Sequence, residues 1–133
     1  MATKKLPFSK NYTKLGWDLF TTIRLDHGNN YYQAGENVEL TLCGAHFHYA
    51  IILGVRKITL HEVSEELAIL DADTSREGFY YLMKGFYSHK YPHIWAGWET
   101  PLILLFLMKS YELETMFIQV DASIYQLKQQ TLF

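Results

Sequence analysis

The sequence predicts a single α+β domain with a mixed, mainly antiparallel β-sheet or small β-barrel, and two helices inserted before the last core strand. Four segments have strand-type patterns, and the interval between the last two has helical patterns. The strand segments are residues 19–25, 37–43, 46–60 and 102–109, and the helical ones are 64–72 and 75–89. A length of 133 residues is that of one domain. We expect a core over about residues 15–110 and a C-terminal extension over 111–133.

The strand predictions rest on alternation of apolar and polar residues. In 19–25, Thr22 and Arg24 fall on one strand face and the leucines on the other. Gly44 and Ala45 are expected to close a hairpin between the second and third strands. The third strand is unusually long and has Gly54 at its middle, where glycine often marks a β-bulge or a bend.

The helix predictions rest on caps and on spacing. Ser64 is a plausible N-cap because two glutamates follow it, where acids suit the helix dipole. Residues 74–77 have the form of a capping box, with Thr74 as the cap and Glu77 in the third position after it. The second helix then presents one apolar face, made of Phe79, Leu82, Met83 and Phe86.

Composition limits the classes of function and the compartment. The formal net charge is −2, so any nucleic-acid contact depends on a local site rather than on a global basic field. Cys43 is the only cysteine, and no secretory signal precedes the domain, which favours a cytoplasmic protein. The most apolar run, from Leu102 to Met108, is far shorter than the roughly 20 residues needed to span a bilayer, so no membrane insertion is expected.

The order of several short motifs is recognisable. Thr22-Ile23-Arg24 is followed by the spaced residues Tyr32, Gly35 and Val38, by the strand end Ile58–Val63, by a Glu-rich helix and by an apolar strand. This order resembles the ASCH domain family of the PUA-like β-barrel superfamily, over residues 15–110. The resemblance implies a small barrel with a cleft between the sheet and the inserted helices.

The resemblance also implies a ligand class and candidate catalytic residues. Family members are proposed to bind RNA or nucleotide-like ligands, and some small bacterial members hydrolyse the amide of acetylated cytidine with a lysine, a threonine and a glutamate. Carried over by position, the threonine is Thr22, the arginine is Arg24 and the carboxylate falls near Asp71. The lysine position, three residues before Thr22, holds Leu19. Lys57 or Lys84 would then have to supply the ammonium from elsewhere in the fold.

The sequence therefore favours a ligand-binding module for RNA or a modified nucleoside. Thr22 and Arg24 would make the polar contacts, because residues i and i+2 of a strand project into the same space. The other candidate ligand contacts are one cation and three aromatic side chains able to stack on bases: Lys57, Tyr91, Trp95 and Trp98. One alternative is an amidohydrolase with Thr22 and Asp71 as catalytic residues. The other is a protein-interaction domain, or an oligomer, that uses the aromatic loop from Tyr91 to Trp98.

No cofactor or metal is expected. His46 and His48 lie on one strand face, but no third ligand follows at a recognisable spacing. Cys43 has no histidine or asparagine partner close in sequence that would suggest a nucleophile.

Overall fold

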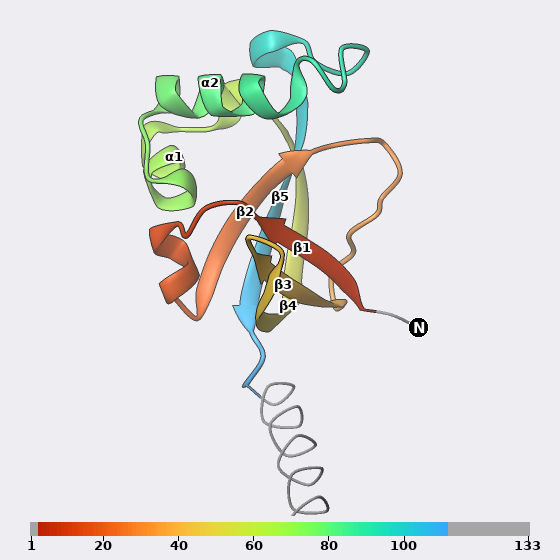
Figure 1. The fold of residues 1–133 in the computed structure, drawn as a ribbon. Coiled ribbons are helices and arrows are strands. Elements are labelled where there is room, and N and C mark those ends of the chain that lie inside the picture. Colours follow the sequence, from red (N-terminus) through yellow and green to blue (C-terminus); the bar gives the residue numbers. More distant parts are fainter. Residues whose placement is uncertain (1–2, 112–133) are drawn as a thin grey trace, which may run out of the picture.

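A computed structural model describes residues 3–111, and its five strands form one mixed sheet with two α-helices beside it (Figure 1). The elements are β1 (Lys4–Phe8), β2 (Leu19–Leu25), β3 (Asn37–Leu42), β4 (Ala45–Thr59), α1 (Glu65–Ala72), α2 (Arg76–Tyr87) and β5 (Pro101–Lys109). Short 3-10 helices lie at Thr13–Gly16, Leu60–Glu62 and Gly97–Glu99. The strand order is β1-β3-β4-β5-β2, in which β1 is parallel to β3 and the other neighbours are antiparallel.

The predicted α+β class, the four strands and the two inserted helices are confirmed. The barrel is not, because the sheet is open, with β1 and β2 as its two edges. Part of the predicted C-terminal extension, from residue 112 on, lies outside the described residues. Within residues 3–111, no helix combines the length and apolar character needed to cross a membrane.

β1 was not predicted from the sequence, because it is short and contains lysine and proline, which are uncommon in strands. Leu6 and Phe8 are buried, whereas Lys5 and Pro7, which alternate with them along the strand, are exposed. Lysine and proline are typical of edge strands, where they block pairing with another chain. β1 brings the start of the chain beside β3, and it becomes one wall of the candidate site.

The long strand β4 joins the two halves of the sheet. Its first half pairs with β3 and its second half with β5. The register against β5 shifts between Ile52 and Gly54, which confirms the predicted bulge. The turn from β3 to β4 is made by Cys43 and Gly44, both with positive φ, 51° and 86°. Two such residues in succession suit the tight turn of a hairpin.

The caps of both helices are serines. Ser64 caps α1 as predicted, and its side chain accepts a hydrogen bond from the Leu67 amide. Ser75, rather than Thr74, caps α2 and accepts from the Gly78 amide. The predicted start of α2 was therefore wrong by one residue. At the other end of α1, Asp73 takes a left-handed conformation, with φ of 57°, that ends the helix.

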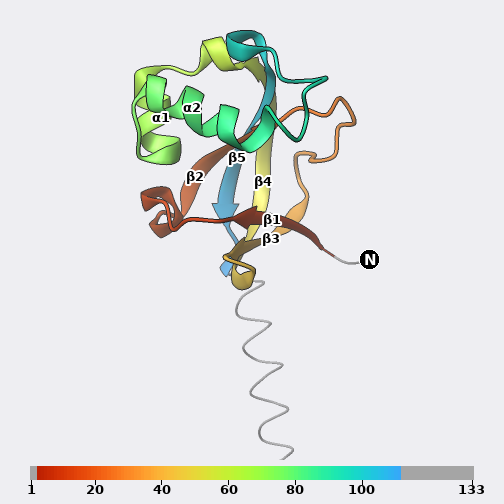
Figure 2. The same ribbon diagram turned by 45° about the horizontal axis from the view of Figure 1, so that its top comes forward.

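Two hydrophobic cores lie at opposite ends of the sheet. One is built between α1, α2 and the sheet and includes Ile23, Phe79 and Met83. The other lies between β1 and the sheet and includes Phe8 and Phe20. Both ribbon views show the helices at one end of the molecule and β1 with β3 at the other (Figures 1 and 2). Arg24 and Thr22, on β2, project between the two cores.

Candidate functional site

Two adjoining cavities open between the cores. The first, of about 290 Å³, is walled by β1, the first 3-10 helix, β2, the end of α1 and α2. Its polar lining consists of Ser9, Lys14, Thr22, Arg24 and Asp71, and its aromatic lining of Phe8, Tyr12, Phe86 and Tyr87. The second cavity, of about 370 Å³, continues past Arg24, Pro7 and Tyr87, which line both.

A buried ion pair lies in the first cavity. The Lys14 ammonium is 3.1 Å from Oδ1 of Asp71, and the two residues are only 2% and 4% exposed. The Thr21 hydroxyl donates a second hydrogen bond, of 3.0 Å, to the same carboxylate oxygen. The ammonium also lies over the rings of Phe8 and Tyr12, 5.4 and 5.5 Å from their centres. The backbone that positions Lys14 is fixed in turn, because the Thr13 amide donates to the Asp73 side chain.

Burial opposes the charge on both members of this pair. It lowers the pKa of the Lys14 ammonium, and the attraction of Asp71 only partly offsets that effect. Burial likewise raises the pKa of the Asp71 carboxyl, against the opposite influence of Lys14 and Thr21. Both groups are thus held closer to their neutral forms than in water, and such perturbed groups in a cavity are characteristic of functional sites.

Thr22 and Arg24 lie side by side on β2. Nε of Arg24 donates a 3.1 Å hydrogen bond to the buried Thr22 hydroxyl, and the guanidinium lies 4.7 Å from the centre of the Phe8 ring. None of the ion pairs formed within residues 3–111 involves Arg24. Its guanidinium, which lines both cavities, is therefore in no direct ion pair with a carboxylate of residues 3–111, and Asp71 of the first cavity acts on it only at longer range.

The second cavity is lined by the loop between β2 and β3, by the end of α2 and by β4. Four tyrosines line it: Tyr31, Tyr32, Tyr87 and Tyr91. Lys57 of β4 and Asp26 at the start of the loop also line it. The His27 ring packs edge-on against the Tyr91 ring, with centroids 4.8 Å apart.

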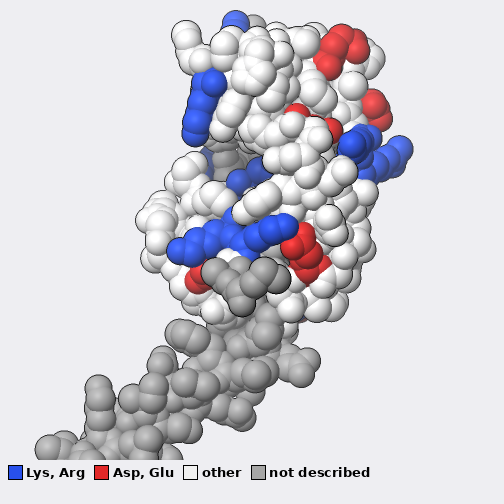
Figure 3. All heavy atoms as spheres, turned by 90° about the vertical axis from the view of Figure 1, so that its right-hand side faces the viewer, with Lys and Arg blue, Asp and Glu red and all other residues white. Residues whose placement is uncertain are grey.

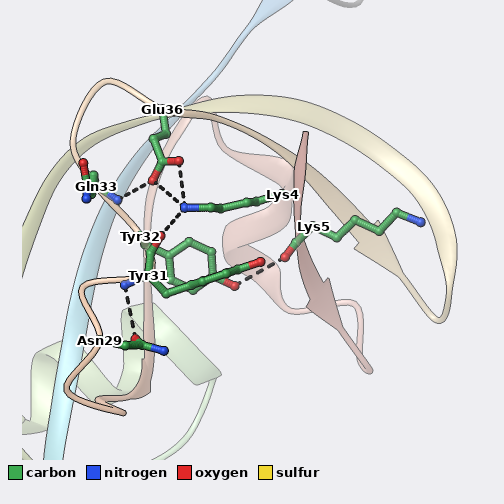
Figure 4. Close-up of polar contacts among 7 residues, drawn as sticks. All are labelled: Lys4, Lys5, Asn29, Tyr31, Tyr32, Gln33 and Glu36. Carbon is green, nitrogen blue, oxygen red and sulfur yellow. Dashed lines mark hydrogen bonds and ion pairs between the residues drawn. The ribbon is translucent and has the colours of Figure 1, made fainter. Parts of the chain in front are cut away.

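The loop that carries Tyr31 and Tyr32 is tied to β1 (Figure 4). The Lys4 ammonium donates to the Tyr31 carbonyl and pairs with Glu36 at 2.9 Å. Glu36 also accepts from the Gln33 amide, at 2.6 Å, so its carboxylate closes the end of the loop. The Tyr32 hydroxyl donates to the Lys5 carbonyl at 3.3 Å. The loop therefore has a defined position on β1.

The structure brings most of the predicted site residues together. Thr22, Arg24 and Asp71 line the first cavity, and Lys57 and Tyr91 line the second with Arg24.

Trp95 and Trp98 line neither of these two cavities. Both pack against the helix-side core, and the Tyr80 ring lies 5.7 Å from Trp95 and 4.6 Å from Trp98. Trp98 makes a second contact, with the Arg76 guanidinium, which lies over its ring at 4.1 Å from the centre. The two indoles are therefore used for intrachain packing.

The lysine of the first cavity is Lys14, which was not among the lysines proposed from the sequence as sources of an ammonium group. Leu19, in the family's lysine position, is 61% exposed and lies in an apolar groove elsewhere on the molecule. Lys57 is in the second cavity, and Lys84 is exposed on α2 and lines neither cavity. Lys14 reaches Asp71 from the segment before β2. The sequence offered one signal, a lysine between Tyr12 and Leu15, but no periodic pattern marked it as buried.

The groove that holds Leu19 belongs to an exposed apolar surface. Its volume is about 330 Å³, and it is lined by Trp17, which precedes β2, and mainly by apolar side chains from β2, β4, β5 and α1, including Leu53, Leu70 and Phe106. Large apolar residues are thus exposed here, whereas the loop from Tyr91 to Trp98 is largely packed against its own chain.

No group of three or more metal-ligating side chains is assembled within residues 3–111. His46 instead pairs with Glu39, at 2.7 Å. Comparison with known proteins finds no matching family model, no matching curated protein and no matching solved structure.

Proposed function

We propose that this chain is a PUA-like ligand-binding module, and that the first cavity holds a nucleoside or a nucleotide-like group of RNA. The observation that carries the proposal is the position of Arg24: a guanidinium without a carboxylate partner in the described chain, at the edge of an aromatic cavity. A largely apolar cavity with a few convergent polar groups is the usual form of a small-molecule site.

The lining matches the chemistry of a nucleoside. Phe86 and Tyr87 in the lining offer ring surface for a planar base. Arg24 has donors for a carbonyl or a phosphate oxygen, and Thr22 adds a hydroxyl beside them. The resemblance of the Thr22–Arg24 motif to the ASCH family points to the same ligand class.

Binding of cytidine and N4-acetylcytidine, measured by calorimetry, tests the proposal. Arg24→Ala is expected to weaken binding by about 1–3 kcal/mol with little change in melting temperature, because it removes charge-assisted hydrogen bonds to the ligand. The matched control is Arg56→Ala, since Arg56 is an exposed arginine of β4 that lines neither cavity. Equal affinity of Arg24→Ala and wild type would contradict the proposal.

A second candidate function is hydrolysis of acetylated cytidine-type nucleosides, and Lys14 is the observation that favours it. The first cavity holds a lysine, a threonine and a carboxylate, the three groups that the family resemblance requires. The pKa of Lys14 is lowered by burial, and a lysine with a lowered pKa is able to act as a general base.

In this scheme the neutral Lys14 amine takes the proton of the Thr22 hydroxyl while Oγ1 attacks the acetyl carbonyl. Lys14 then returns the proton to N4 of cytidine as the C–N bond breaks, which leaves an acetyl ester on Thr22. Water hydrolyses the ester, with Lys14 again moving the proton. Asp71 holds Lys14 in position, and Arg24 stabilises the negative charge that develops on the carbonyl oxygen.

Release of cytidine from N4-acetylcytidine tests this second candidate. Thr22→Val removes the hydroxyl and keeps the shape of the side chain, and Lys14→Met removes the ammonium. Each is expected to lower turnover by about 10²–10⁴-fold. Turnover that survives both substitutions would exclude this mechanism. If wild type binds cytidine but shows no turnover, the hydrolase function is excluded and only the binding function is supported.

A further inference from the structure

The second cavity has the features of a site for another nucleotide. It is larger than the first, about 370 against 290 Å³, and the two share the wall made by Pro7, Arg24 and Tyr87. A group bound in the first cavity therefore has a direct path past Arg24 into the second. A free nucleoside would leave the second cavity unfilled.

The cationic side chains lie where the phosphate backbone of a single-stranded oligonucleotide would pass. Arg24 is at the junction of the two cavities, and Lys57 lines the second one. Asp26 is the acidic residue in its lining, and its carboxylate already accepts from the Gly28 amide at 2.7 Å. Figure 3 shows Lys and Arg side chains inside a hollow on this face and in a band below it. Cations at a junction between two aromatic cavities suit a bridging phosphate.

The aromatic lining supplies the surface for a second base. Tyr31 is 48% exposed. The Lys4 ammonium lies 4.4 Å from the centre of its ring and the Tyr32 ring meets it edge-on at 4.8 Å, so a base would stack on the ring surface that these two contacts leave exposed. The loop is fixed before any ligand arrives, because Lys4 and Glu36 tie it to β1 (Figure 4). Fixing the tyrosines in advance reduces the ordering that binding would otherwise require.

From this arrangement we infer that the second cavity is a subsite for the adjacent nucleotide, so that the ligand is a single-stranded oligonucleotide rather than a free nucleoside. The first base occupies the first cavity, the linking phosphate meets Arg24, and the second base stacks among the tyrosines. This inference rests on the proposed nucleoside-binding function of the first cavity.

The test compares cytidine, cytidine 5′-monophosphate, the dinucleotide CpC and its DNA counterpart dCpdC by calorimetry. CpC is expected to bind about 10- to 100-fold more tightly than cytidine, since stacking of one base on an aromatic side chain has an effect of that size. Cytidine 5′-monophosphate should fall between them. Tighter binding of both dinucleotides, or of CpC alone, supports the inference and shows whether the 2′-hydroxyl is read.

Variants of the second cavity provide the matched comparison. Tyr31→Ala should remove most of the gain of CpC over cytidine and leave cytidine binding unchanged, whereas the control Tyr81→Ala changes neither, because Tyr81 is exposed on α2 and lines neither cavity. Lys57→Ala should weaken CpC binding and reduce its salt dependence, and its strand neighbour Arg56 gives the control Arg56→Ala.

The outcomes separate the two ideas. If CpC binds no more tightly than cytidine 5′-monophosphate, or if Tyr31→Ala leaves the gain intact, the second subsite is overturned and nucleoside binding by the first cavity stands. If neither cytidine nor any of the other three probes binds, both the subsite and the proposed function are overturned.

Discussion

Two cations connect the helical end of the molecule to the rest of the chain, and they do so in different ways. Arg76, at the start of α2, donates hydrogen bonds of 2.8 and 2.9 Å to the carbonyls of Val63 and His61 and lies over Trp98. Lys14 lies in the first cavity, 3.1 Å from the buried carboxylate of Asp71.

The difference separates a cation used for structure from one suited to chemistry. Arg76 satisfies backbone carbonyls and an indole face while its own residue stays partly exposed, so little charge has to be removed from water. Lys14 and Asp71 are both removed from water, and a buried ion pair is weak evidence for stability, because the loss of hydration can exceed the attraction of the charges. We therefore assign Arg76 to folding and Lys14 to the site.

The largest predicted effect is that of Lys14→Met. It leaves the Asp71 carboxylate buried without its cation, and we expect the free energy of unfolding to fall by about 3–5 kcal/mol. The measurement is a urea titration. The double variant Lys14→Met/Asp71→Asn removes both charges, and its stability is expected to return to within about 1 kcal/mol of wild type or to exceed it. A double variant as unstable as the single one would show that the pair itself supports the fold.

Arg76→Ala is expected to lower the free energy of unfolding by about 2–3 kcal/mol, because charge-assisted hydrogen bonds to two carbonyls and a contact with Trp98 are lost. Under conditions in which the variant is fully folded, its affinity for cytidine should equal that of wild type, since Arg76 lines neither cavity. The exposed Arg56→Ala should stay within about 0.5 kcal/mol of wild type. A stable Arg76→Ala protein that no longer bound cytidine would break the assignment to folding.

The pH dependence of stability sharpens the same contrast. Burial raises the pKa of Asp71 in the folded state, so its contribution is complete below the unfolded pKa of about 3.9 and is lost as the pH rises through the folded pKa. The free energy of unfolding of wild type, relative to that of Lys14→Met/Asp71→Asn, should therefore decline as the pH rises above about 4. Other carboxylates cancel in that difference, and a relative stability that rises over this range would contradict the burial effect.

The smallest predicted effect is that of Leu19→Lys. Leu19 is exposed and lies in the apolar groove rather than in either of the two cavities, so a lysine there should change stability by at most about 0.5 kcal/mol. Hydrolysis of N4-acetylcytidine should be unchanged as well. A gain of hydrolysis in Leu19→Lys, measured beside wild type, would show that the family's lysine position reaches the site after all.

Local patterns were sufficient for most of the fold. Ser64 was identifiable as a cap, and Gly54 as a bulge, because each signal depends on neighbouring residues only. Thr22 and Arg24 were identified as neighbours for the same reason, since strand alternation places them on one face.

The features of the fold and the site that were not predicted depend on contacts between residues far apart in the chain. β1 pairs with β3 across more than thirty residues, and its lysines and proline give no strand pattern. The partner of Asp71 is Lys14, 57 positions earlier, and only the folded packing of the first 3-10 helix against α1 brings them together. The sequence allowed the indoles of Trp95 and Trp98 either to stack on a ligand or to pack within the protein. They pack against Tyr80 of α2, a contact that the sequence pattern did not indicate.

The pairing of β1 with β3 has a consequence for how ligands of this protein can be found. The first cavity takes residues from β1, β2, α1 and α2, so it exists only while the edge strand is docked and both cores are formed. A compound that binds there binds the native state alone, and at one hundred times its Kd it would stabilise that state by about 2.7 kcal/mol. Thermal melting against a panel of nucleosides and short oligonucleotides would then rank ligands, and hydrogen exchange at the β1 amides would report occupancy, because a bound ligand stabilises the state in which β1 is docked.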